Sequence, residues 1–133
     1  MISDYEDIAE YILKNYSNKV VEIGVGSLPQ VAVLLKDKLD VVVTDVNEQE
    51  YLDIRFYKDD IFTPDIGIYK NASLIYSIRP PIDLQEAMAK TAKEVGADLL
   101  IRPFGNENAD LSRHFKNHAL VNYKKARFYL YRS

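Results

Sequence analysis

The sequence contains no cysteine, and this absence excludes several kinds of site before any motif is considered. Without thiols the chain cannot form disulfides, bind zinc through thiolates or use a cysteine nucleophile. The absence of cysteine also fits a protein of a reducing compartment. Residues 1–6 contain neither a basic region nor an apolar segment of the kind that forms a signal peptide. No apolar run is long enough to span a membrane, so we expect a cytoplasmic protein without a membrane partner.

Size and composition favour one globular domain. The chain has 133 residues, enough for one domain with a substantial core and too few for two ordinary ones. Apolar residues make up 47% of the sequence and charged residues 28%, which is typical of a globular protein rather than a disordered one. We therefore predict a single domain over residues 1–133.

Acidic residues are absent from the end of the chain, so charge is unevenly distributed. The net charge is −3, yet residues 113–133 hold six Lys or Arg and no acid, which leaves residues 1–112 with a net charge of −9. The basic segment either faces an anionic partner such as RNA or balances an acidic body. Lys124, Lys125 and Arg127 are the candidate RNA contacts, because aromatic residues that can stack on bases lie between them. Aromatic side chains in a hairpin also pack on a sheet, so both interpretations stay open.

The order of apolar segments predicts a mixed α/β fold. An amphipathic helix runs to about Tyr16, with Ser3 and Glu6 spaced as a capping box at its start. A second helix follows residues 27–30, where Ser27 and Gln30 are spaced as a second capping box, and a third spans about residues 83–95. The strands are predicted at 20–24, 40–44, 54–57, 73–78, 99–101, 118–123 and 127–131. This order predicts a three-layer Rossmann-like core with a mostly parallel sheet and a C-terminal antiparallel hairpin.

A glycine turn follows the first predicted strand. The pattern Gly24-x-Gly26-x-x-Pro29 lets the backbone turn sharply and approach a ligand closely. The third glycine of the dinucleotide fingerprint is missing, which disfavours a pyrophosphate cofactor and makes a nicotinamide-dependent oxidoreductase the weaker alternative. Glu22, just before the turn, can meet a cationic amine.

Two further strands end in acidic residues. Asp45 ends the second strand, where a carboxylate can accept hydrogen bonds from both vicinal hydroxyls of a ribose. Asp60 follows the third strand next to Asp59. Each also has a structural interpretation, since Asp45 can cap a turn through Asn47 and the other two can be solvated loop charges. Their shared position at the carboxyl ends of strands favours a nucleoside site.

These motifs resemble those of the Rossmann-like, class I methyltransferases that use S-adenosylmethionine. The resemblance implies that the glycine loop faces the methionyl part of that cofactor, that the acid after the second strand holds the ribose, and that the acid after the third lies near the adenine amine. Methyltransferases of this class also end in an antiparallel strand pair. The cofactor-binding residues that the resemblance implies are Glu22, Gly24, Gly26, Ser27, Asp45 and Asp60.

A second resemblance covers nearly the whole chain. Residues 59–64, 75–81 and 120–123 resemble signatures of a small archaeal family of uncharacterised proteins built on the same core. This likeness implies the fold and adds no activity. The hypothesis is therefore an S-adenosylmethionine-binding protein of unidentified substrate. The alternative is a catalytically inactive methyltransferase-fold module that binds RNA or a protein partner through the basic hairpin.

Two arginine-proline pairs end strands that we expect to be neighbours. Strand spacing is about 4.8 Å, so the guanidinium groups of Arg79 and Arg102 are predicted to converge over one crevice. There they would bind a carboxylate or phosphate of the substrate or of the cofactor's methionyl end. The alternative is that each pairs with a nearby acid such as Glu86 or Glu107. Enzymes of the class that methylate exocyclic amines have Asn, Asp or Ser at the position of Arg79, where an acceptor can orient the amine. Arginine only donates hydrogen bonds, so the sequence disfavours an amine methyltransferase of that type.

Other catalytic motifs are absent from the sequence. It has no Gly-x-Ser-x-Gly elbow and no phosphate-binding Walker loop. His114 and His118 are spaced as two ligands on one helix face, but no acidic third ligand lies between them. We therefore predict no metal site. Leu28 stands where many of these methyltransferases have a third glycine or another small residue.

Overall fold

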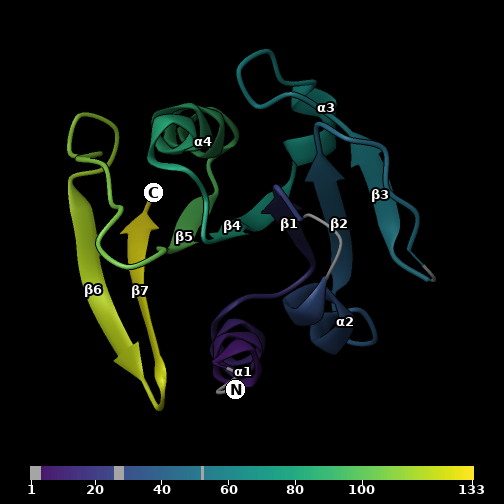
Figure 1. The fold of residues 1–133 in the computed structure, drawn as a ribbon, viewed down its shortest axis with the longest axis horizontal. Coiled ribbons are helices and arrows are strands. Elements are labelled where there is room, and N and C mark those ends of the chain that lie inside the picture. The colour runs from purple at the N-terminus through teal and green to yellow at the C-terminus, as the bar shows by residue number, and fades with distance from the viewer. Residues whose placement is uncertain (1–3, 26–28, 52) are drawn as a thin grey trace.

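A computed structural model describes residues 4–25, 29–51 and 53–133, and its centre is one seven-stranded sheet (Figure 1). The strand order is β3-β2-β1-β4-β5-β7-β6. The first five strands along the chain run parallel, and β7 lies antiparallel to both β5 and β6. The strands are β1 Lys19–Ile23, β2 Asp40–Asp45, β3 Arg55–Lys58, β4 Ala72–Ile78, β5 Asp98–Arg102, β6 Asn117–Tyr123 and β7 Ala126–Arg132.

Helices cover both faces of the sheet. α1 (Tyr5–Asn15) and α2 (Gln30–Leu35) lie on one face, and α3 (Ile66–Tyr69) and α4 (Ile82–Val95) on the other, as Figure 1 shows. The predicted three-layer α/β fold with a C-terminal antiparallel hairpin is therefore confirmed. Within the described residues, no helix combines the length and apolar composition needed to cross a membrane.

Alternation along the central strands builds a core on each side. Val20 packs into the cluster under α1 and α2, whereas its neighbour Val21 packs into the cluster under α3 and α4. Both side chains are fully buried, as are Leu74 and Ile75 of β4. Strands covered on both faces need continuous apolar runs, which is why β1 and β4 were recognisable in the sequence.

The helix starts differ from the prediction. Ser3, the predicted cap of α1, lies outside the described residues, and the N-cap is Asp4, whose side chain makes no capping bond. Ser27, predicted to cap the second helix, also lies outside them, and α2 has Pro29 as its N-cap. α3 was not predicted, because four residues are too few to show a helical period.

The sheet topology determines where a ligand can bind. The chain leaves β1 toward β2 and β3 on one side, and continues from β4 to β5 on the other. In open α/β sheets the crevice at such a reversal, beside the carboxyl ends of the strands, is the usual binding site. Gly24 follows β1 and Arg79 follows β4, so both lie at this reversal.

Candidate functional site

The turn after β1 needs glycine at its first position. Gly24 has a left-handed φ of 69°, and its amide donates to the carbonyl of Thr44 at 2.9 Å. A Cβ added here would meet no heavy atom within 4 Å, so the backbone faces open space. A side chain would enter that space and would also strain the backbone. Gly26, Ser27 and Leu28 lie outside the described residues, and their predicted roles stay predictions.

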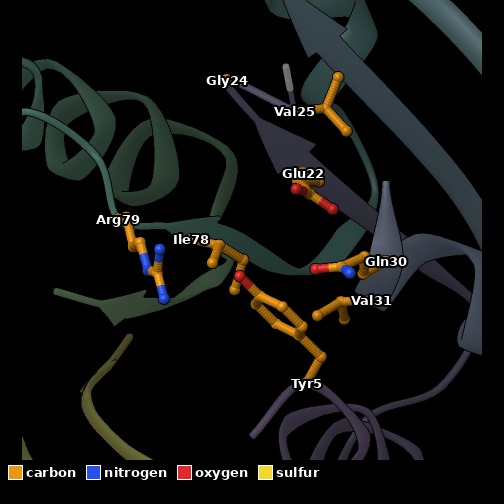
Figure 2. A pocket seen from close by; sticks show the side chains of 8 residues that line it. All are labelled: Tyr5, Glu22, Gly24, Val25, Gln30, Val31, Ile78 and Arg79. Atoms are coloured by element: carbon orange, nitrogen blue, oxygen red, sulfur yellow. The ribbon is translucent and has the colours of Figure 1, made fainter. Parts of the chain in front are cut away.

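A pocket of about 220 Å³ opens beside this turn, and we call it the β1–α2 pocket. It is formed by the first residue of α1, the end of β1, the start of α2 and the end of β4. Figure 2 shows side chains from these elements converging, with Tyr5, Glu22 and Gln30 on one side and Arg79 opposite. The lining residues are Tyr5, Glu22, Gly24, Val25, Gln30, Val31, Ile78 and Arg79.

Glu22 is a buried acid at this pocket. It is 3% exposed, and its Oε1 has no hydrogen-bond partner among the described residues. Tyr76, its register partner on β4, has a buried hydroxyl that also lacks a partner there. Burial raises the pKa of Glu22 to about 8, and the nearby Tyr76 hydroxyl offsets only part of that rise. A cation in the pocket would stabilise the ionised carboxylate and would therefore lower the pKa of Glu22.

A second pocket, of about 350 Å³, lies across Gly24 at the ends of β2 and β3, and we call it the strand-end pocket. Val46 and Phe62 line it although they are 55% and 57% exposed, so apolar surface faces the opening. Such surface suits a planar ring. The lining residues are Ile23, Gly24, Thr44, Asp45, Val46, Asp59, Asp60, Ile61, Phe62 and Leu84.

Short turn bonds orient two acids of the strand-end pocket. One carboxylate oxygen of Asp45 accepts from the amide of Asn47 at 3.0 Å, so the turn that the sequence offered as an alternative is present. Asp60 accepts in the same way from the amide of Phe62 at 2.9 Å. These bonds orient each carboxylate at the pocket, and the predicted ligand roles stay predictions.

Asp59 has a structural role. One of its oxygens accepts from the Tyr69 hydroxyl at 2.6 Å, and the other from the amide of Asp65 at 3.0 Å. Both oxygens therefore bind the segment that leads into α3. Of the adjacent pair, Asp60 is left as the better ligand candidate.

The two arginines do not converge as predicted. Arg102 is in register with Ile78, and Arg79 lies one residue further on in a left-handed conformation with φ 55°. Arg79 lines the β1–α2 pocket, 5.9 Å from the Phe104 ring, and makes no ion pair with any described residue. Arg102 turns instead to Asp4, which is 7% exposed, and donates from Nε to its carboxylate at 2.8 Å.

The acids predicted as alternative partners of these arginines have other contacts. Glu86 forms an ion pair with Arg113. Glu107 contributes its carbonyl, which accepts from Gln85 at 2.8 Å. Pairing of Arg102 with an acid is thus observed, but the acid comes from the other end of the chain.

Gln85, a buried side chain of α4, fixes the loop after β5. Its amide nitrogen donates to the Glu107 carbonyl, and its amide oxygen accepts from the Ala109 amide, both at 2.8 Å. The loop is thereby held over the sheet end near the hairpin.

A third pocket, of about 240 Å³, lies between this loop and the hairpin, and we call it the hairpin pocket. Two of the three predicted RNA contacts, Lys125 and Arg127, line it. The third, Lys124, instead donates to both carboxylate oxygens of Glu10 at 2.8 and 2.9 Å. The lining residues are Asp4, Arg102, Pro103, Gly105, Asn106, Leu120, Lys125, Arg127 and Tyr129.

The two histidines are separated by their contacts. His114 lies 3.3 Å from the Glu86 carboxylate, whereas His118 is on β6 and stacks on Tyr131 with ring centroids 5.9 Å apart. Across the described ranges, no group of three or more His, Cys, Asp or Glu side chains could hold a metal ion.

Several pocket residues were missed by the sequence reasoning. The sequence analysis assigned no ligand role to Val46 or Phe62 of the strand-end pocket, or to Tyr5 of the β1–α2 pocket. The available signal was position, since Val46 directly follows Asp45 and Phe62 lies two residues beyond Asp60. An apolar residue next to an acid at a strand end can contact the ligand that the acid binds.

Comparison with known sequences gives one family. Residues 5–133 match the family described as "Uncharacterised protein family (UPF0146)". A UPF0146 protein of Archaeoglobus fulgidus is 44% identical over 127 residues, which cover 94% of this chain and 92% of the relative. Another, from Methanocaldococcus jannaschii, is 41% identical and covers 94% and 91% of the two chains.

Comparison with solved structures gives the methyltransferase fold. A TehB-like SAM-dependent methyltransferase from Corynebacterium glutamicum superposes with a TM-score of 0.65 at 14% identity, over 96% of this chain and 85% of the other. The N-terminal domain of EvdMO1 with SAH bound superposes with a TM-score of 0.69 at 11% identity, over 100% and 82%. At such identities the likeness concerns the fold alone, and the predicted fold is confirmed.

Proposed function

Since the chain belongs to UPF0146, an uncharacterised archaeal family, and has the methyltransferase fold, we propose that it binds S-adenosylmethionine. The observation that carries the proposal is the position of Gly24. Its open backbone lies between the β1–α2 pocket, which contains a buried acid, and the strand-end pocket, which contains two oriented acids. S-adenosylmethionine is a nucleoside joined to an amino acid, so each of its two ends has a complementary pocket.

The strand-end pocket would hold the adenosine. Asp45 would accept hydrogen bonds from the ribose hydroxyls, and Asp60 from the adenine amine. Val46 and Phe62, whose side chains already face the opening, would contact the purine ring. Acids for the sugar and apolar groups for the base are the combination that a nucleoside requires.

The β1–α2 pocket would hold the methionyl part. Glu22 would ionise opposite the cationic amine, which compensates a carboxylate that burial otherwise keeps protonated. Arg79, which has no ion pair in the described part of the chain, would bind the carboxylate. Each charged group of the ligand thus has a partner of opposite charge.

S-adenosylmethionine supplies an electrophilic methyl group on a sulfonium sulfur. The chain would contribute position: the turn at Gly24 fixes the point where the two pockets meet, and Tyr5 closes one side of the β1–α2 pocket. Holding donor and acceptor in line is the main catalytic requirement for methyl transfer. We propose no general base, because the methyl acceptor is not identified and no described side chain of these pockets can be assigned to deprotonate it.

Isothermal titration calorimetry with S-adenosylmethionine and S-adenosylhomocysteine tests the proposal. Both should bind the wild-type protein. Asp45→Ala should weaken binding by about 1–3 kcal/mol, because a charged acceptor is lost. Asp37→Ala is the matched control, since it removes an exposed aspartate at the opposite end of β2.

Two outcomes would contradict the proposal. One is the absence of heat from either compound with protein shown to be folded by circular dichroism. The other is equal weakening by Asp45→Ala and Asp37→Ala, which would mean that binding follows net charge rather than the strand-end pocket.

A further inference from the structure

We infer that the hairpin pocket binds the phosphate group of a small-molecule methyl acceptor. The identity of the ligand as a methyl acceptor rests on the proposed function. The anion site itself rests on the residues of the hairpin pocket alone. This pocket lies outside both parts of the proposed cofactor site, and within the described residues only Arg102 of its three basic residues forms an ion pair.

The charge of the hairpin pocket selects an anion. Lys125 and Arg127 form no ion pair with any residue in the described ranges. Arg102 is neutralised by Asp4, so these four charged side chains leave an excess of two positive charges at the pocket. The carboxylate of Asp7 accepts a hydrogen bond from the main-chain amide of Lys125 at 2.9 Å. Guanidinium and ammonium groups that converge without acid partners suit a phosphate.

The hairpin pocket adjoins the β1–α2 pocket. The amide of Arg79 donates to the carbonyl of Arg102 at 2.6 Å, and these two arginines line the two different pockets. Asp4 lines the hairpin pocket, and Tyr5, the next residue in the sequence, lines the β1–α2 pocket. A ligand with its phosphate in the hairpin pocket therefore has its other end directed along Arg79 toward the proposed methyl donor.

The surroundings favour a small molecule over RNA. A volume of about 240 Å³ suits a phosphate with a few attached atoms. Lys124 is bound to Glu10, and Arg113 to Glu86, so two of the basic residues that an RNA strand would use are already neutralised. Residues 1–112, with a net charge of −9, would repel a long polyanion.

A phosphate titration followed by ¹H–¹⁵N NMR tests the site, with sodium chloride adjusted to hold ionic strength constant. Wild-type protein should show saturable shifts at the amides of Gly105, Asn106 and Lys125. Arg127→Ala should raise the Kd at least about tenfold, because a charge-assisted partner is lost. Arg132→Ala, which removes the same charge from the exposed end of the same strand, should change it less than about twofold.

Ribose 5-phosphate provides a second probe, because a phosphate ester should bind at least as tightly as inorganic phosphate. Shifts that do not saturate, or equal losses in Arg127→Ala and Arg132→Ala, would overturn the inference. A single-stranded RNA decamer that binds more tightly than ribose 5-phosphate and loses affinity equally in Lys124→Ala and Arg127→Ala would also overturn it, in favour of an RNA surface.

Failure of this inference can be told apart from failure of the proposed function. Asp45→Ala should lose affinity for S-adenosylhomocysteine and keep the wild-type Kd for phosphate. If wild-type protein binds phosphate through Arg127 but binds no S-adenosylhomocysteine, the anion site stands and its assignment to a methyl acceptor falls. If it binds S-adenosylhomocysteine but not phosphate, this inference alone is wrong.

Discussion

Replacing Glu22 by Gln should change how the stability of the protein depends on pH. In the folded protein burial keeps the carboxyl protonated up to about pH 8, whereas the unfolded chain ionises near its ordinary value of 4.5. Between these values the folded state holds a proton that the unfolded state has released. The free energy of unfolding should therefore fall as pH rises through this interval.

The expected loss is large relative to the stability of a small domain. The difference between a pKa of 4.5 and one of about 8 corresponds to roughly 4–5 kcal/mol between pH 4.5 and pH 8. A domain of this size has about 5–15 kcal/mol in total. Glu22→Gln has nearly the same shape and does not titrate, so it should be close to wild type at pH 5 and several kcal/mol more stable at pH 8.

Urea unfolding followed by circular dichroism at pH 5, 6, 7 and 8 measures this effect. Glu48→Gln is the control, because Glu48 is exposed and its variant should follow the wild-type curve. If the difference between wild type and Glu22→Gln is the same at every pH, the carboxyl does not titrate as described and the argument from burial is wrong.

Three further predictions concern neighbouring residues. Gly24→Ala should destabilise the protein by about 1–2 kcal/mol in urea and abolish calorimetric binding of S-adenosylhomocysteine, because its φ is 69° and its Cβ would enter the pocket; unchanged binding would exclude Gly24 from the site. Asp4→Ala should cost about 2 kcal/mol, because Arg102 loses a charged hydrogen-bond partner; a wild-type urea midpoint would show that the pair is not stabilising. Arg79→Gly should be about 1 kcal/mol more stable than Arg79→Ala in thermal unfolding, because both variants remove the side chain and only alanine keeps the strained Cβ; equal stability would argue against strain at φ 55°.

The fold was largely predictable from local patterns. β2 and β4 are apolar runs buried on both faces, and α4 shows a helical apolar stripe that ends at Gly96 in a left-handed cap. The strand β3, which the structure places at the sheet edge, and the antiparallel hairpin were also expected. Each of these features is encoded within about fifteen residues or fewer, so pattern and turn chemistry suffice to find it.

Side-chain partners were not predictable, because they depend on register and on distant segments. Arg102 pairs with Asp4, 98 residues away, and Lys124 with Glu10, 114 residues away. Neighbouring strand ends suggested that Arg79 would lie beside Arg102, but the one-residue offset in register and the left-handed turn separate their side chains. The positions of the acids at strand ends were expected correctly, and the apolar surface between them was not.

The two hydrogen bonds of Gln85 have a consequence for local unfolding. They join the loop over the hairpin pocket to the first turn of α4, and we expect loop and helix to open as one cooperative unit. The Ala109 amide should then exchange its hydrogen with solvent only when α4 opens, and at the same rate as the core amides of that helix. A surface loop that exchanges as slowly as a buried helix keeps one wall of the pocket in place between binding events.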